Sequence, residues 1–391
     1  MTTSISDLVR RLREQVTLTA AADMAWFAGL VVVAILSALA VAATLLWVAG
    51  NPPGSAFSSM LQGSLGSMPS FVTTLNHTGP ILVVAIGAAI AGRAGLVNIG
   101  QEGQFVIGAT LGVVVGLSMP GPIVLVLPAV LLAAALGGAC WAGIAAILRH
   151  QAGVSEVITT LLLNFIAFAL VSYLVNRSWL LQETVPEGSI QPPTPQSDPI
   201  GAAARLPVLA SGSGYRLHVG IFLALALALA AGFAIARTTW GFRLRMFGLN
   251  KRTAKRAGVS DLGFGSGALL ISGAFAGLAG GVILSGVAFR VNPGLSNNYG
   301  WEGLLVALVA GFSPIFAIFV AFLFGALRAG GGVLAATGVN SAIVGVVQSL
   351  IVLAIMLPSL YVRRRKRRRQ ARLMVEQIEA EAEANVAKAG A

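Results

Sequence analysis

Charged residues are scarce in this sequence. Only 10% of the 391 residues are Asp, Glu, Lys or Arg, whereas 56% are hydrophobic; a soluble domain has about 25% charged residues. The stretches 24–92 and 103–148 contain no charged residue at all. A membrane-spanning helix needs about 20 mostly apolar residues, so these stretches hold several such helices. The composition excludes a soluble globular protein and predicts an all-α polytopic membrane protein.

Residues that commonly carry out chemistry are equally few. The one cysteine, Cys140, excludes an intrachain disulfide and is expected to pack as a small apolar residue. The three histidines, His77, His150 and His218, lie far apart, with no cysteine or carboxylate at a spacing typical of metal ligands. No lysine follows a glycine, so the chain lacks a phosphate-binding P-loop. We therefore expect no catalytic or metal site and no ATPase activity in this chain.

The apolar stretches predict about ten transmembrane helices in a single bundle. Prolines, glycines and basic residues mark the ends of the first seven. Residues 176–214 are rich in proline and polar side chains, so we interpret them as an external loop. The seven helices are expected at 24–49, 71–92, 102–119, 122–148, 155–175, 216–237 and 264–289.

The stretch 301–360 is harder to divide, because a cytoplasmic C-terminus requires an odd number of crossings. Breaks at 313–314 and 330–332 separate the pieces 301–312, 314–330 and 336–359. The first piece covers about 18 Å as a helix, so we predict a half-span buried within the protein. This division puts Arg328 near the outer face, against the usual cytoplasmic bias of basic residues.

The net charge of +12 is concentrated next to the apolar stretches. Basic clusters at 237–256 and 363–369 mark the cytoplasmic side, so topology explains the charge without a nucleic-acid partner. Residues 1–23 have apolar residues at helical spacing, which predicts an amphipathic helix on the cytoplasmic membrane surface. The tail 362–391 combines a basic anchor for anionic membrane lipids with an acidic end. We expect a membrane domain at 24–361 with both termini in the cytoplasm.

Polar residues within the apolar stretches are the candidates for a substrate pathway. The segment 93–102, RAGLVNIGQE, crowds polar groups between two spans, where ionisable residues usually have a function. An ordinary interfacial loop would explain this segment equally well. The other polar residues are isolated, and bonds to a neighbouring helix explain them more readily than pore lining. The candidates are Asn76, His77, Asn98, Glu102, Gln104, Asn164 and Gln348.

The basic segment 241–260, GFRLRMFGLNKRTAKRAGVS, has six basic residues and no acidic one. One interpretation is a solvated loop that maintains orientation. However, Arg252, Lys255, Arg256 and Val259 recur at helical spacing, and residues 248–250 resemble a cap before a helix. A rigid basic helix that projects from the bundle is suited to docking a soluble partner.

Four stretches together resemble the nucleoside and simple-sugar branch of ABC importer permeases, within the branched-chain-amino-acid and ribose type family. They are GLVNIGQEGQ at 95–104, GVSEVITTLLLNFI at 153–166, the segment 241–258 and the segment 300–330. The third resembles the cytoplasmic coupling segment of that family, G-x3-R-x2-G-x-N-x3-A-x3-G. Its counterparts here are Gly241, Arg245, Gly248, Asn250, Ala254 and Gly258, although Met246 and Phe247 replace residues that are usually small.

This resemblance implies one permease subunit of a bacterial inner-membrane importer. It implies a second permease subunit, either a paralogue or another copy, together with partner ATPase subunits that hold ATP and Mg²⁺ and a substrate-binding lipoprotein. The coupling segment at 239–262 would dock in a groove of the ATPase. The alternative is an ion-coupled secondary transporter, which usually has an acidic residue at mid-span. Here Glu102, Glu156 and Glu302 all fall near the predicted span ends.

Overall fold

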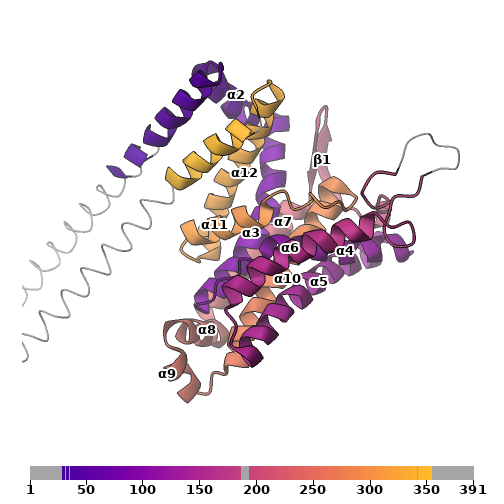
Figure 1. The fold of residues 1–391 in the computed structure, drawn as a ribbon, viewed down its shortest axis with the longest axis vertical. Helices are drawn as coiled ribbons and strands as arrows, with labels where there is room; N and C mark the ends of the chain where they lie inside the picture. Colours follow the sequence, from indigo (N-terminus) through magenta and orange to yellow (C-terminus); the bar gives the residue numbers. More distant parts are fainter. Residues whose placement is uncertain (1–28, 31, 35, 186–192, 341, 355–391) are drawn as a thin grey trace, which may run out of the picture. The chain divides into compact units, whose positions relative to one another are not determined.

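The computed structural model describes residues 29–354, except for 31, 35, 186–192 and 341 (Figure 1). The predicted N-terminal helix 1–23 and the tail 362–391 lie outside the described residues. The chain divides into two units, one formed by Met1–Ser58 with Leu334–Ala391 and the other by Ser59–Val333. They are described separately.

The described part of the first unit is helical. The helix Val32–Val48 agrees with the predicted first span, and Ala342–Ala354 falls within the predicted last one. A bend of 115° separates Val32–Val48 from α2, Pro53–Leu65, which continues into the second unit. The sequence-based prediction placed spans at 24–49 and 71–92 and missed this helix between them. Proline is well tolerated in the first turn of a helix, because its missing N–H would be unpaired there in any case.

The second unit is a bundle of helices, which confirms the all-α polytopic class. Among the described residues, six helices are long and apolar enough to cross a membrane, and a seventh span results if the bent pair is counted as one. The six are α3 Met68–Arg93, α5 Ile123–Ala152, α6 Glu156–Val175, α7 Gly220–Arg237, Asp261–Ala288 and α12 Pro314–Ala336. The fifth is composed of π-helix η2 Asp261–Ser266, α10 Gly267–Ile283 and π-helix η3 Leu284–Ala288.

Glycines bring the central helices into backbone contact. A Cβ added to Gly108 of α4, Gln101–Ser118, would lie 2.3 Å from the Gly277 Cα of α10. A Cβ on Gly138 of α5 would lie 2.1 Å from the Gly273 carbonyl oxygen. In lipid, small residues of this kind let helix backbones approach closely. This close packing holds α4, α5 and α10 together and fixes the position of the segment between α3 and α4.

The described residues of the loop 176–214, which was predicted to be external, make backbone hydrogen bonds to the end of the α10 span. The nitrogens of Ser197, Ile200 and Leu206 donate to carbonyl oxygens of the segment 285–291, at 2.8–2.9 Å. The loop contains the short 3-10 helix η1, Ala202–Ala204. It ends in an antiparallel hairpin of β1, Val208–Gly212, and β2, Tyr215–His218, with an irregularity in the pairing between Val208 and Ala210.

The hairpin corrects the predicted start of the sixth span. That span was expected from residue 216, but Arg216 belongs to β2 and the helix begins at Gly220. The apolar residues at the hairpin end pack against the bundle rather than cross a membrane, so composition placed the boundary too early.

The last third of the second unit contains the expected short helix. Helix α11, Tyr299–Val309, has 11 residues, or about 16 Å, which agrees with a half-span. The predicted break at 330–332 was wrong, because α12 continues through it to Ala336. A Cβ on Gly330 would lie 2.4 Å from the Met60 carbonyl oxygen, so this glycine serves close packing. The backbone turns instead at Gly338, where φ is +93°.

Candidate functional site

The segment between α3 and α4 forms a buried polar network. Asn98, Gln101, Glu102 and Gln104 are each at most 2% exposed. The Asn98 Nδ2 donates to Gln104 Oε1 at 2.8 Å and to Ser272 Oγ at 2.9 Å, and Gln104 Nε2 donates back to Asn98 Oδ1 at 3.1 Å. These amides therefore satisfy one another and tie the segment to α10.

Helix α6 holds the same segment from its other side. The Asn164 Oδ1 accepts from Gly103 N at 2.9 Å, while its Nδ2 donates to the Ile99 carbonyl at 3.0 Å. The Thr160 hydroxyl accepts from Ile99 N at 3.2 Å. Because the side chains of Asn98, Gln104 and Asn164 are paired within the protein, they tie residues 98–104 to α6 and α10.

Glu102 links this network to the half-span. Its Oε1 accepts from Trp301 N at 3.1 Å, and the Ser296 hydroxyl and Gly300 N–H also contact the carboxylate. The backbones of α4 and α11 are also close to each other, since a Cβ on Gly300 would lie 2.5 Å from Glu102 N. The carboxylate thus occupies the N-terminus of α11, where unpaired backbone N–H groups favour negative charge.

A second cluster joins α3, α11 and α12. The His77 Nδ1 and the Tyr299 hydroxyl are 2.5 Å apart. The Arg328 guanidinium lies 4.0 Å from the centre of the Tyr299 ring, donates to Glu302 Oε1 at 2.7 Å and reaches the Asn297 carbonyl at 2.6 Å. Sequence reasoning named His77 and missed the other members. The sequence did contain a signal for an ion pair in this cluster, because Glu302 and Arg328 are the only charged residues in the apolar segment 300–330.

The two remaining candidates are Asn76 and Gln348. The Asn76 Nδ2 donates to the Arg216 carbonyl of the hairpin at 2.8 Å. Gln348 is on the helix Ala342–Ala354 of the first unit. Within the second unit, the structure brings Asn98, Glu102, Gln104 and Asn164 together. His77 contacts Tyr299, which stacks on Phe105 of α4, whereas Asn76 contacts the hairpin.

The predicted coupling segment folds into two short helices, α8 Thr239–Leu249 and α9 Lys251–Arg256. The expected cap is confirmed, because Asn250 Oδ1 accepts from Arg252 N at 3.0 Å and from Thr253 N at 3.1 Å. Ala254 is fully buried. Gly258 ends the segment with φ at +78°, a conformation that disfavours other residues.

Glycines join the coupling segment to the bundle without intervening side chains. A Cβ on Gly241 would lie 2.4 Å from the carbonyls of Ala234 and Ile235, so the turn from α7 into α8 is tight. A Cβ on Gly248 would lie 2.1 Å from the Arg93 carbonyl oxygen. Gly95, with φ at +71°, faces the Gly248 carbonyl in return. The end of α8 therefore touches the start of the polar segment directly.

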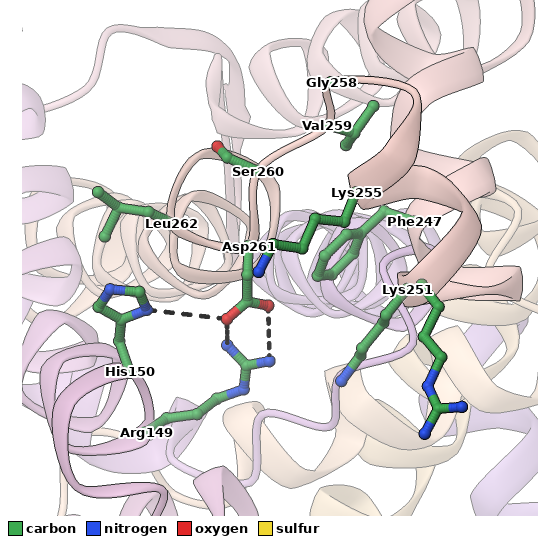
Figure 2. Close-up of a pocket in the computed structure, with 11 residues that line it drawn as sticks. Arg149, His150, Phe247, Lys251, Lys255, Gly258, Val259, Ser260, Asp261 and Leu262 are labelled. Atoms are coloured by element: carbon green, nitrogen blue, oxygen red, sulfur yellow. Dashed lines mark hydrogen bonds and ion pairs between the residues drawn. The ribbon is translucent and has the colours of Figure 1, made fainter.

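A basic pocket of about 590 Å³ lies beside this segment (Figure 2). Asp261 faces Arg149 and His150 of α5 and accepts from the Arg149 guanidinium at 2.9 and 3.1 Å. Arg149 also lies 3.6 Å from Glu156 at the start of α6. This ion-pair cluster ties the ends of three helices together next to α9. The pocket is lined by Arg149, His150, Phe247, Lys251, Arg252, Lys255, Gly258, Val259, Ser260, Asp261 and Leu262.

Across the described ranges, no group of three or more His, Cys, Asp or Glu side chains is arranged to hold a metal ion. A polytopic bundle with a buried polar network and a capped basic projection is typical of a membrane transport subunit. A family model described as the permease component of branched-chain amino acid transport systems matches residues 70–357, and the chain belongs to this family.

Characterised relatives match most of the chain. The guanosine ABC transporter permease NupP of Bacillus subtilis is 34% identical over 82% of this chain and 90% of its own length. The glucose ABC transporter permease TsgB13 of Haloferax volcanii is 34% identical over 84% of this chain and 87% of its own. The nucleoside ABC transporter permease NupB of Lactococcus lactis is 30% identical over 82% and 88%. No solved structure matches the chain.

Proposed function

We propose that this chain is the membrane-spanning permease subunit of an ABC importer that takes up nucleosides or related simple sugars. Two of the three relatives described above are named for guanosine or nucleosides and one for glucose, which favours nucleosides. The observation that carries the proposal is the α8–α9 segment, a capped basic projection in backbone contact with the polar segment between α3 and α4.

In the proposed mechanism, partner ATPase subunits hold ATP and Mg²⁺ and bind α8 and α9. Because ATP binds one arrangement of the ATPase more tightly, it shifts the permease between access states. The contact of Gly248 with the Arg93 carbonyl passes the displacement to the polar segment. Glu102 then carries it to the start of α11 through its bond to Trp301 N.

The polar candidates divide into two roles under this proposal. Asn98, Gln104 and Asn164 position the polar segment, since their amides are bonded within the protein. Asn76, His77, Glu102 and Gln348 remain proposed substrate-pathway residues.

The assembly we propose has a second permease subunit and a substrate-binding lipoprotein in a bacterial inner membrane. In Bacillus subtilis two different permease proteins, NupP and NupQ, are both named for guanosine, which supports a paired arrangement. The basic segment α8–α9 and both termini would face the cytoplasm, as the bias of basic residues predicts.

The test is uptake of radiolabelled adenosine, cytidine and ribose by a strain that lacks the gene, with and without complementation. We expect complementation to restore nucleoside uptake, and excess unlabelled nucleoside to compete it away. Arg245→Glu should abolish uptake by reversing a charge of α8, whereas the control Arg177→Glu in the external loop should not. Restoration of ribose uptake alone would change the substrate class. Uptake that stops with a proton uncoupler while ATP stays high would refute an ATP-driven importer.

A further inference from the structure

The β1–β2 hairpin precedes α7, and α8 and α9 follow it at the opposite end (Figure 1). Residues of the hairpin line a small cavity. Helix α7 has 18 residues, or about 27 Å, so the cavity and the coupling segment are well separated. Its volume is about 280 Å³, slightly below the roughly 300–1,000 Å³ of drug-sized ligand pockets. The lining residues are Asn76, Arg205, Leu206, Val208, Arg216, His218, Gly286, Val287 and Phe289.

His218 contributes a buried donor that has no partner. Its side chain is 2% exposed, and its Nδ1 accepts from Gly220 N at 3.1 Å. Burial lowers the pKa of His218 to about 4, so the ring is neutral at pH 7 and its proton sits on Nε2. This Nε2–H finds no acceptor among the described residues. The ring lies against Gly286, where a Cβ would be 2.8 Å from Nε2. A buried donor without an acceptor is unfavourable, so a ligand acceptor would stabilise the site here.

Asn76 contributes a buried acceptor, also without a partner. Its Nδ2 donates to the Arg216 carbonyl, which fixes the orientation of the amide. The Oδ1 of the same amide is buried and receives no hydrogen bond from the described residues. A ligand that fills the cavity therefore needs a donor as well as an acceptor.

Two guanidinium groups complete the polar lining. Arg205 is held in place by the Ile200 carbonyl, at 3.0 and 3.2 Å, and by the Phe289 ring at 4.5 Å. Arg216 lines the cavity from β2. No acidic side chain lines it, so several N–H donors face one acceptor. Hydroxyl and carbonyl oxygens of a ligand would pair with the donors, and a hydroxyl or amino hydrogen would pair with Asn76.

We propose that this cavity is an outer binding site for a small neutral solute rich in hydroxyl groups, namely a nucleoside or a pentose. The inference rests on the proposed function for its substrate class, and it adds the location of a binding site within this one chain. A purely apolar ligand would leave the His218 Nε2–H and the Asn76 Oδ1 unpaired. A simple anion would offer no hydrogen to the Asn76 Oδ1.

The test is protection of an introduced thiol in the complete transporter. Val287 lines the cavity and is 50% exposed, so Val287→Cys in a Cys140→Ala background gives a reporter for a membrane-impermeant thiol reagent. Leu209→Cys is the matched control, because Leu209 lies on β1, is 54% exposed and does not line the cavity. We expect adenosine, cytidine or ribose to slow modification of the first thiol and leave the second unchanged.

Two variants in the Val287→Cys background identify the groups that bind. His218→Asn keeps an acceptor for Gly220 N and removes the Nε2–H, and Arg216→Gln removes a cation. Each should raise the solute concentration for half protection by about tenfold, the effect of one lost buried hydrogen bond. The control Arg177→Gln, an exposed cation of the same loop, should leave it unchanged.

The outcomes separate this inference from the proposed function, because nucleoside uptake is measured in the same cells. Uptake without protection of Val287→Cys would overturn the site while the importer stands. Protection without uptake would support the site and contradict the importer. Protection by adenosine monophosphate but not by adenosine would overturn the neutral-solute assignment.

Discussion

Replacement of Gly248 by alanine is the sharpest test of how the coupling segment meets the bundle. Ordinary van der Waals contact begins at 3.4 Å, whereas the new Cβ would lie 2.1 Å from the Arg93 carbonyl oxygen. The backbones must therefore separate by about 1.3 Å, the difference of these two distances. The obstacle is a backbone atom, so no side-chain rotation relieves it.

Overpacking of this kind costs about 1–3 kcal/mol. If the strain acts on the equilibrium between access states, it corresponds to about a 5–150-fold change in coupling. We therefore expect Gly248→Ala to lower the uptake rate per inserted transporter at least about fivefold. Substrate-stimulated ATP hydrolysis by the complex should fall in parallel.

The matched control is Gly267→Ala at the start of α10. Gly267 is also helical, and its Cβ would meet nothing within 4 Å. This variant should insert and transport like the wild type. Equal uptake rates for Gly248→Ala and Gly267→Ala, at equal membrane levels, would refute the idea that α8 drives the polar segment through this contact.

Three further predictions follow from single contacts. Hydrogen bonds from Thr194, Gln196 and Arg290 lower the pKa of Glu183 from 4.5 to about 2. The ionised Glu183 therefore stabilises the folded loop above about pH 4.5, and this contribution is lost as the pH falls toward 2. Proteolysis of the external loop should accelerate only in that acid range, and Glu183→Gln should remove the pH dependence. Asn250→Ala should cost about 1 kcal/mol by uncapping α9 and reduce uptake, with rescue by Asn250→Asp. Glu102→Ala leaves the Trp301 N–H unpaired and should lower the free energy of unfolding by about 1–3 kcal/mol. Glu102→Gln retains an acceptor and should not. Equal melting temperatures for the two variants would contradict the bond from Trp301 N to Glu102.

The sequence predicted those features that depend on local composition. The charge-free stretches located several helices, and the Asn250 cap followed from residues within a few positions. The half-span at Tyr299–Val309 followed from the short piece before the break at 313–314 together with the odd number of crossings expected for 301–360. The glycines at 330–332 misled the division of the last third, because a glycine that breaks a helix and one that packs against another helix look alike in sequence.

Features that depend on distant contacts could not be predicted. The Arg328–Glu302 pair and the contact of Tyr299 with His77 join residues far apart in the chain. The hairpin that ends at His218 is similarly hidden, since the same short apolar pattern fits the beginning of a span. One sequence signal was available in retrospect: a buried charge needs a partner, so Arg328 within an apolar stretch required an acid nearby.

Under the proposed function, the pairing of Asn98, Gln104 and Asn164 explains how their segment can transmit movement in coupling. A loop with unpaired groups would absorb a displacement by changing its own conformation. Here Asn98, Gln104 and Asn164 are bonded on both sides, and a Cβ on Gly100 or Gly103 would already meet neighbours at 3.0 Å or less. Close-packed interiors have low compressibility and transmit strain. Under the proposed function, a push at Gly248 moves the segment as a unit, and the Glu102 carboxylate transfers that movement to the half-span α11 through its bond to Trp301 N.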